Sequence, residues 1–165
     1  MTEPSNTSSE DVSRVWKLME DIGICMMASH DGSAIRARPM GARPREGGNV
    51  VYFLTSARGD KDNEIEADSA VSLMFAKPNA ATFLVVTGRA RVLNDRALIR
   101  DLWTSGDSTW WSDAEDADIR VIAVTPADAQ FWEGPHGVLG TTASVLSAMA
   151  GNAPILGDQR KVKLS

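Results

Sequence analysis

Two arginines stand two residues apart in the stretch IRARPMGARP, residues 35–44. Successive side chains of a β-strand point to opposite faces, so Arg36 and Arg38 would leave the same face of one strand. Pro39 follows at once, and because proline lacks the N–H that a sheet ladder uses, it belongs on an edge strand or at a bulge. Such an opening beside two guanidinium groups suits an anionic ligand, whereas a solvated strand face would explain the arginines without one.

A second group of hydroxyl and cationic side chains directly follows an apolar strand, in FLTSARGDK, residues 53–61. It comprises Thr55, Ser56, Arg58 and Lys61. Backbone amides at the start of a following helix would add further donors for an anion. The combination suits a phosphate group, although loops rich in serine and lysine are also common where no ligand binds.

Two further features could bring a flat ligand close to the backbone. Gly88 interrupts the β-branched strand VVTGRARV, which fits either a structural bulge or the close approach of such a ligand. Trp132 stands beside Gly-Pro in FWEGP, residues 131–135. It fits core packing, a dimer contact or contact with the ring edge of a cofactor.

Composition limits the possible classes of protein. The chain has 165 residues, the size of one domain, and a net charge of −5 with dispersed basic residues, which argues against a nucleic-acid partner. Cys25 is the single cysteine and lies in an apolar run, so we expect a core residue, and with His30 and His136 in turn-like sequence no metal site is expected. The polar residues 1–8 are expected to form a disordered tail. No membrane span and no signal peptide are expected, which favours a cytoplasmic protein.

Helical spacing of apolar residues predicts two helices that would flank these strands. The first covers residues 9–22 with Ser9 as its cap, and the second covers 94–103 and begins at Asn94. The polar segment 56–68 predicts a short surface helix. The C-terminal part of the chain predicts a short helix and a tail.

Strand patterns dominate the remaining sequence. The Asp31-Gly32 pair predicts a tight hairpin between the first two strands. The sixth strand is expected to end at Pro126, with Trp132 just beyond it. The predicted strands lie at 22–29, 34–42, 50–55, 70–76, 81–93 and within 119–134. Six strands joined mostly by hairpins predict a mainly β fold with flanking helices, an antiparallel barrel or sandwich. No GxGxxG motif follows a strand, which argues against a Rossmann fold.

Four short motifs in this order resemble the bacterial general stress protein 26 family. They are RPM at 38–40, FLTSARGDK at 53–61, TGRARV at 87–92 and FWEGP at 131–135. That family belongs to the pyridoxamine 5′-phosphate oxidase-like split barrels, which bind flavin mononucleotide (FMN). The resemblance implies a six-stranded antiparallel split β-barrel, a single FMN-binding domain over residues 9–165. It also implies a homodimer with two flavin sites at the subunit interface.

The same resemblance implies which residues hold the phosphate end of the cofactor. Arg38 would hold the FMN phosphate, and Lys61 would supply a second cation. Thr55 and Ser56 would bond to the phosphate or the ribityl chain. Arg36 would be a neighbour that adds positive field, or an ordinary exposed side chain.

At the ring end, the resemblance implies backbone and aromatic contacts. The backbone at Pro39 and Met40 would run beside the isoalloxazine ring, and Trp132 of the partner subunit would lie near it. No acid, base or nucleophile of the protein is required for hydride transfer, so no catalytic residue is assigned.

The implied function is that of an FMN-dependent oxidoreductase of the general stress type, acting on an unknown small molecule. Alternatives are a non-catalytic flavin-binding or sensor protein and a split-barrel enzyme that uses a deazaflavin coenzyme; FAD is a further possible flavin. The scarcity of histidines argues against haem. Pyridoxamine 5′-phosphate oxidase activity is not expected, because those enzymes carry a longer C-terminal segment whose arginine and histidine bind the substrate phosphate, and DQRKVKLS offers no counterpart of that pair.

Overall fold

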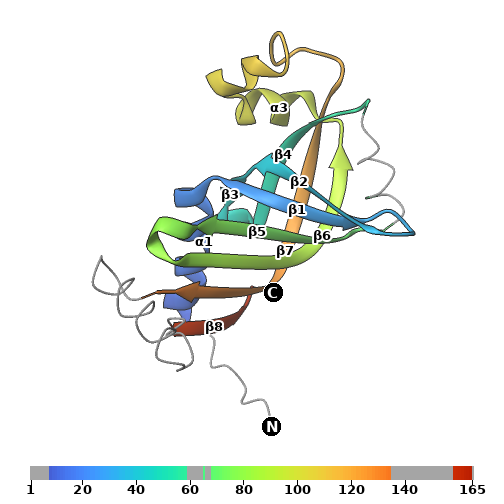
Figure 1. Ribbon diagram of the computed structural model, residues 1–165. Coiled ribbons are helices and arrows are strands. Elements are labelled where there is room, and N and C mark those ends of the chain that lie inside the picture. The colour runs from blue at the N-terminus through green and yellow to red at the C-terminus, as the bar shows by residue number, and fades with distance from the viewer. Residues whose placement is uncertain (1–7, 59–64, 66–67, 135–157, 165) are drawn as a thin grey trace.

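The computed structural model describes residues 8–58, 65, 68–134 and 158–164. Its centre is an antiparallel sheet in the order β2-β1-β5-β6-β7-β4-β3, with β8 paired to the free part of β7 (Figure 1). The strands are β1 Ile24–His30, β2 Ile35–Gly41, β3 Arg43–Arg45, β4 Val50–Ser56, β5 Ala70–Lys77, β6 Thr82–Leu93, β7 Ile119–Glu133 and β8 Asp158–Lys163. The helices are α1 Ser9–Ile22 and α3 Arg96–Leu102, with short 3-10 turns at Glu46–Gly48, Pro78–Ala80 and Ser105–Thr109.

The sheet curls into a barrel that stays open between its two ends. β2 lies next to β4 without pairing with it, although the two strands stand far apart in the strand order. We call this unpaired boundary the seam. The predicted antiparallel split barrel is therefore confirmed, and the seam is its split.

Helix α1 is held at both ends by hydrogen bonds of its capping residues. The Ser8 hydroxyl accepts from the backbone N–H of Asp11 at 3.1 Å, so the N-cap is Ser8 and the prediction of Ser9 is wrong by one residue. Gly23 ends the helix with φ 73°, and its N–H donates to the carbonyl of Met19. The predicted helix itself, over 9–22, is confirmed.

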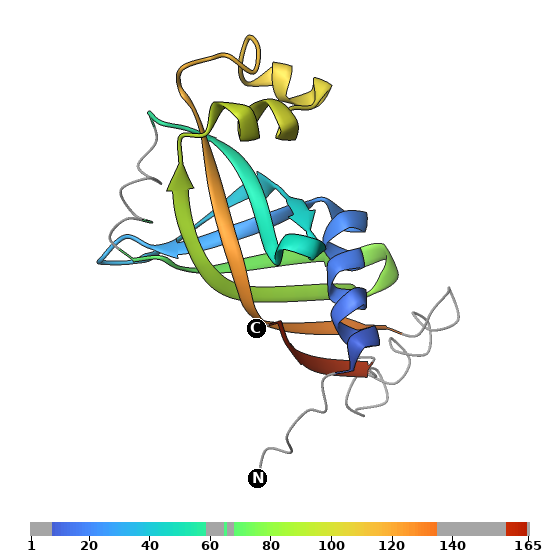
Figure 2. The same ribbon diagram turned by 180° about the vertical axis from the view of Figure 1, so that it is seen from behind.

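One apolar core fills the concave side of the sheet under α1. The helix contacts β3, β5, β6 and β8 and runs across the curled strands (Figure 2). Trp16 of α1 packs with fully buried side chains such as Met27, Phe53, Phe75 and Leu84. Burial of such a side chain contributes about 1.5–3 kcal/mol, so this core fixes the curvature of the strands that carry the seam.

The longest strand, β7, pairs with β4 through its first half and with β8 through its second half. A bulge lies near the middle of β7, where it pairs with β6. Thr87 faces Asp128 and the next residue, Gly88, faces Pro126, so one residue of β7 between them has no partner on β6. A Cβ atom on Gly88 would stand 2.3 Å from the carbonyl oxygen of Thr125, so the structural reading of this glycine is confirmed. The expectation that the strand ends at Pro126 is wrong: the bulge absorbs the proline, and the strand continues through Trp132.

A second apolar cluster joins α3 to the convex side of β4 and β7. Ile99 and Leu102 of α3 pack there against Leu54. The helix is shorter than predicted, and its cap is Asp95, whose carboxylate accepts from the Leu98 N–H at 3.0 Å, instead of Asn94. This cluster fixes the end of β4 that carries Thr55 and Ser56.

Among the described residues there are eight strands, where the sequence predicts six. The two additions are β3, in a segment expected to be a Gly- and Pro-rich loop, and β8, in the expected tail. Asp31-Gly32 lies in a loop of four residues between His30 and Ile35, longer than a two-residue hairpin.

Several expectations concern segments beyond the described residues. The tail at 1–8 lies there apart from Ser8, as does most of the helix at 56–68, of which Ile65 is helical. A short helix is also expected in the C-terminal segment 138–165, of which residues 138–157 lie outside the described residues. Within the described part of the chain, no helix is long and apolar enough to cross a membrane.

Candidate functional site

Arg36 and Arg38 lie on the same face of β2, as their spacing predicts. Arg38 faces Met27 of β1, and Arg36 faces Ser29, and directly opposed residues of an antiparallel pair share one face of the sheet. Met27 and Met40 on that face belong to the concave core. Both arginines therefore start from the concave side of the barrel.

The Arg38 side chain is held by a buried serine. Its Nη1 donates to the Ser29 hydroxyl at 2.6 Å, and Ser29 is only 3 % exposed. Ser29 is an important residue that the sequence reasoning missed. A signal was present, because Ser29 stands at an inward position of the apolar run IGICMMAS, where a lone hydroxyl requires a polar partner.

Arg36 instead faces the hairpin loop. Its Nε donates to the Asp31 carboxylate at 2.8 Å, and its side chain is 60 % exposed. The same carboxylate accepts from the backbone N–H groups of Ser33 and Ala34. The bond from Arg36, followed by those from Ser33 and Ala34, holds the pKa of Asp31 well below its usual range. Arg36 is therefore bound by the hairpin loop, whereas Arg38 is hydrogen-bonded to a residue of β1 in the wall of the barrel.

Thr55 and Ser56 end β4 on the other side of the seam. Thr55 follows Phe53 on the concave face and is 2 % exposed, whereas Ser56 lies on the opposite face and is half-buried. Because β2 and β4 are neighbours, the structure brings the strands of Arg38 and Thr55 together at the seam, each with its side chain on the concave side. Lys61 lies outside the described residues.

The segment after β4 is tied to the start of β7. The N–H of Ala57 donates to the carbonyl of Asp118 at 2.7 Å, and the exposed Arg58 guanidinium forms an ion pair with the Asp118 carboxylate at 2.5 Å. These contacts fix the direction in which the chain leaves Ser56. The ion pair with Asp118 also holds the Arg58 side chain beside the start of β7.

An apolar patch covers the convex face of β2, β1, β5 and β6. Its exposed large side chains, which we call the outer patch, are Ile24, Met26, Ile35, Met74 and Phe83. Pro39 is exposed beside it, opposite Met26, whereas the Met40 side chain points into the core.

Trp132 extends this convex face onto β7, where it faces Phe83. It is therefore on the opposite face of the sheet from Arg38 and Thr55, and a single chain does not bring it to them. Cys25 is buried in the core, as expected, and desolvation raises the pKa of its thiol to about 12.

The seam, with a guanidinium and hydroxyls on a curled antiparallel sheet, has the architecture of a split-barrel protein that can bind an anion. Residues 10–154 match the model of the family described as "pyridoxamine 5′-phosphate oxidase like". The chain belongs to this family, and the resemblance inferred from its four motifs is confirmed at that level.

Individual relatives are distant in sequence. The Neurospora crassa protein bli-3 is 22 % identical over 141 residues, covering 78 % of this chain and 68 % of that protein. A protein described as general stress protein 26 from Jannaschia sp. CCS1 shares the fold with a TM-score of 0.73 and 16 % identity, covering 94 % of this chain and 99 % of the other. The general stress FMN/FAD binding protein of Xanthomonas citri has a TM-score of 0.70 and 20 % identity, covering 79 % and 94 %.

Proposed function

We propose that this protein binds FMN at the seam between β2 and β4 and acts as a flavin-dependent oxidoreductase on a small molecule. The observation that carries the proposal is Arg38, a half-buried residue whose guanidinium donates to the buried Ser29 hydroxyl, on a strand that lies next to the strand of Thr55 across the split. A related protein of this fold, from Xanthomonas citri, is described as FMN/FAD binding.

The chemistry of these side chains fits the phosphate end of FMN. A guanidinium has five N–H donors, so Arg38 can bond to Ser29 and to a phosphate at the same time. Charge-assisted hydrogen bonds of this kind are about twice as strong as neutral ones. Thr55 would add a hydroxyl donor from the concave face, and Lys61 would add a second cation. The Ser56 side chain starts from the opposite face, so it would add a donor only because it stands at the very end of β4. When bound, the flavin itself supplies the hydride chemistry, and the chain supplies binding, orientation and exclusion of water.

The outer patch supports a homodimer. Soluble monomers rarely expose large contiguous apolar patches, and here five large apolar side chains share one convex face with Pro39. Because Trp132 is on the face opposite to Arg38, only a second copy can present this residue to a flavin at the seam. We therefore propose a site completed by the partner's Trp132, with the backbone of Pro39 beside the ring.

Absorption spectroscopy of the purified protein tests this proposal. The visible band of oxidised flavin, present as purified or after addition of FMN, is expected, with FAD tested in parallel. Colourless protein that stays so in excess FMN contradicts it. Flavin reduction by NAD(P)H with turnover of an added acceptor distinguishes an oxidoreductase from a passive flavin-binding or sensor protein, and the mass of the bound molecule distinguishes FMN from a deazaflavin.

A further inference from the structure

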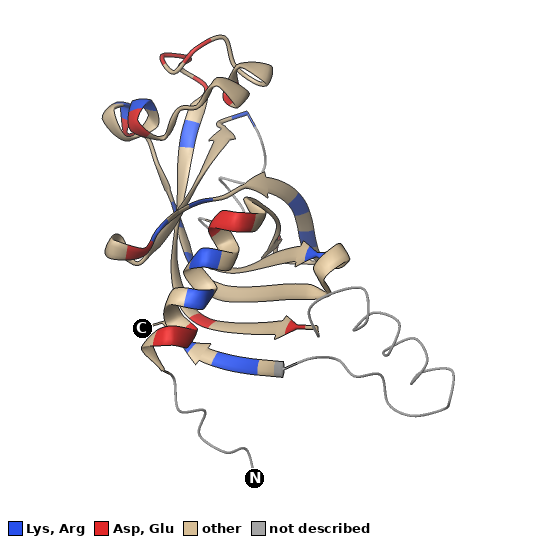
Figure 3. Ribbon diagram, turned by 90° about the vertical axis from the view of Figure 1, so that its left-hand side faces the viewer, with Lys and Arg blue, Asp and Glu red and all other residues tan. Residues whose placement is uncertain are grey.

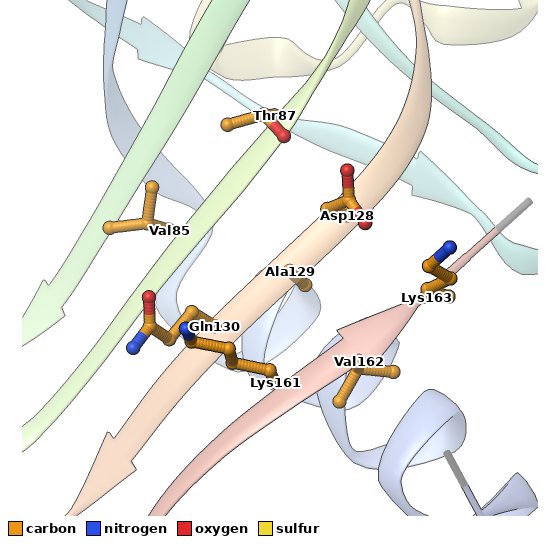
Figure 4. A pocket seen from close by; sticks show the side chains of 8 residues that line it. All are labelled: Val85, Thr87, Asp128, Ala129, Gln130, Lys161, Val162 and Lys163. Carbon is orange, nitrogen blue, oxygen red and sulfur yellow. The ribbon is translucent and has the colours of Figure 1, made fainter. Parts of the chain in front are cut away.

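A groove crosses the convex face of β6, β7 and β8. It has a volume of about 290 Å³, and Figure 4 shows the side chains that line it, among them Val85, Thr87, Asp128, Gln130 and Lys161. The intervening residues of β7 and β8, Ala129 and Val162, are buried in the core, so the groove belongs to the outside of the barrel.

The strand register arranges the groove in two rows of different character. In the first row, Val85 faces Gln130, which in turn faces Lys161. This row offers an apolar wall, an amide and an ammonium group in sequence. Figure 4 shows the Gln130 and Lys161 side chains extending next to one another.

The second row is electrically balanced. Thr87 faces Asp128, which faces Lys163. A carboxylate stands directly opposite Lys163 in the strand register, whereas no acidic residue lines the first row among the described residues of the groove. The lysine of the groove that faces no carboxylate is therefore Lys161, on a strand that is basic along most of its length (Figure 3).

The groove also adjoins the residue that we place at the flavin. Trp132 and Gln130 are two residues apart on β7 and share its convex face, and Trp132 faces Gln159 in the next row along β8. In the proposed dimer, the groove of one subunit would then lie beside the flavin whose ring is contacted by that subunit's Trp132.

We propose that this groove is a substrate subsite for a small organic carboxylate, a step that rests on the proposed function. The carboxylate would bind the Lys161 ammonium and the Gln130 amide, and the apolar body would lie against Val85. The volume is near the lower limit of small-molecule pockets, which suits a molecule of about the size of one substituted ring. The protein as a whole is acidic, so a local cation at a groove is a selective feature and not a consequence of net charge.

Benzoate and benzamide are matched probes, since they share size and shape and differ in charge. Titration of the isotope-labelled full-length protein, followed by NMR, is expected to move amide signals of Val85, Gln130 and Lys161 with benzoate. Benzamide is expected to bind at least about tenfold more weakly, because it cannot form the charge-assisted bond. Equal affinity for the two probes, or signal changes confined to other surfaces, would overturn the proposal.

Two lysine variants on the same strand give the sharper comparison. Lys161→Met keeps the aliphatic stem and is expected to weaken benzoate binding about tenfold. Lys163→Met, at a position that faces Asp128, is expected to change it by no more than about twofold. Equal losses in both variants would contradict the assignment to Lys161.

FMN affinity, measured separately by fluorescence, should not change in either lysine variant. Failure to bind FMN would refute the proposed function, whereas normal FMN binding without Lys161-dependent benzoate binding would refute only the subsite.

Discussion

Replacement of Arg38 by alanine provides a strong test of the seam as the phosphate site, with Arg36→Ala as the matched control. The two residues share a strand and a face, and they differ in their surroundings. Arg38 is bonded to the buried Ser29 at the seam, whereas Arg36 is bonded to Asp31 in the hairpin loop and is mostly exposed.

The magnitudes follow from these surroundings. A hydrogen bond between a guanidinium and a charged acceptor contributes about 1.5–3 kcal/mol, so loss of Arg38 is expected to cost about 2–3 kcal/mol of FMN binding, or about 30- to 150-fold in Kd. Exposed charges are screened by salt, so Arg36→Ala is expected to cost about 0.5 kcal/mol or less, about twofold.

Quenching of FMN fluorescence, recorded at constant ionic strength, measures both dissociation constants. Chemical denaturation checks that each variant retains the fold of the parent protein. Small and equal losses for Arg36→Ala and Arg38→Ala would refute the placement of the phosphate at Arg38. A larger loss for Arg36→Ala would shift the phosphate towards the hairpin loop.

Three further predictions concern the frame around the seam. Gly88→Ala forces a Cβ to within 2.3 Å of a β7 carbonyl oxygen and is expected to lower the free energy of unfolding by about 1–3 kcal/mol, measured by denaturant titration, whereas Gly47→Ala, in open space, should be nearly neutral. Desolvation raises the pKa of the Asp107 carboxyl, but hydrogen bonds from an arginine on β3 and from its own capping box outweigh this and leave the pKa below its ordinary 3.8. Stability from this lowered pKa is therefore complete above about pH 4 and lost as pH falls further, and Asp107→Asn is expected to flatten the acid limb of the stability profile. Met74→Glu on the outer patch is expected to convert the proposed dimer to a monomer in sedimentation velocity and to weaken FMN binding, whereas Trp110→Ser, at a site 78 % exposed elsewhere, should do neither.

Each of these predictions has a result that would contradict it. A Gly88→Ala protein as stable as the parent would mean that the bulge can relax around a methyl group. An unchanged acid limb in Asp107→Asn would show that other carboxylates govern acid unfolding. A Met74→Glu protein that remains dimeric would move the interface away from the outer patch.

Local sequence patterns predicted most helices and strands, but they did not predict where β7 ends or that β3 and β8 form. Helix α1 and most strands follow directly from apolar spacing, and an antiparallel barrel or sandwich follows from the number and order of the strands, whereas the split barrel was implied by the family resemblance. Pro126 misled because a proline usually ends a strand, whereas the bulge opposite Gly88 accommodates it within β7. β3 and β8 were missed because short or strongly charged strands gain their stability from the neighbours with which they pair.

The features of the site that depend on residue spacing within a strand could be predicted from the sequence. Those that depend on contacts between distant parts of the chain could not. The shared face of Arg36 and Arg38 follows from strand geometry. Their difference depends on Ser29 and Asp31, which the fold brings to them as hydrogen-bond partners. That Trp132 lies on the opposite face could be known only from the register of β6 and β7, since the expected end of the strand left its direction undefined.

Native mass spectrometry of the purified full-length protein, after incubation with excess FMN, tests the central claim most directly. A dimer that carries two FMN molecules is expected, and Arg38→Ala is expected to need about 30- to 150-fold more FMN to reach the same occupancy. A protein that carries no FMN, or that binds it equally well without Arg38, would contradict the account.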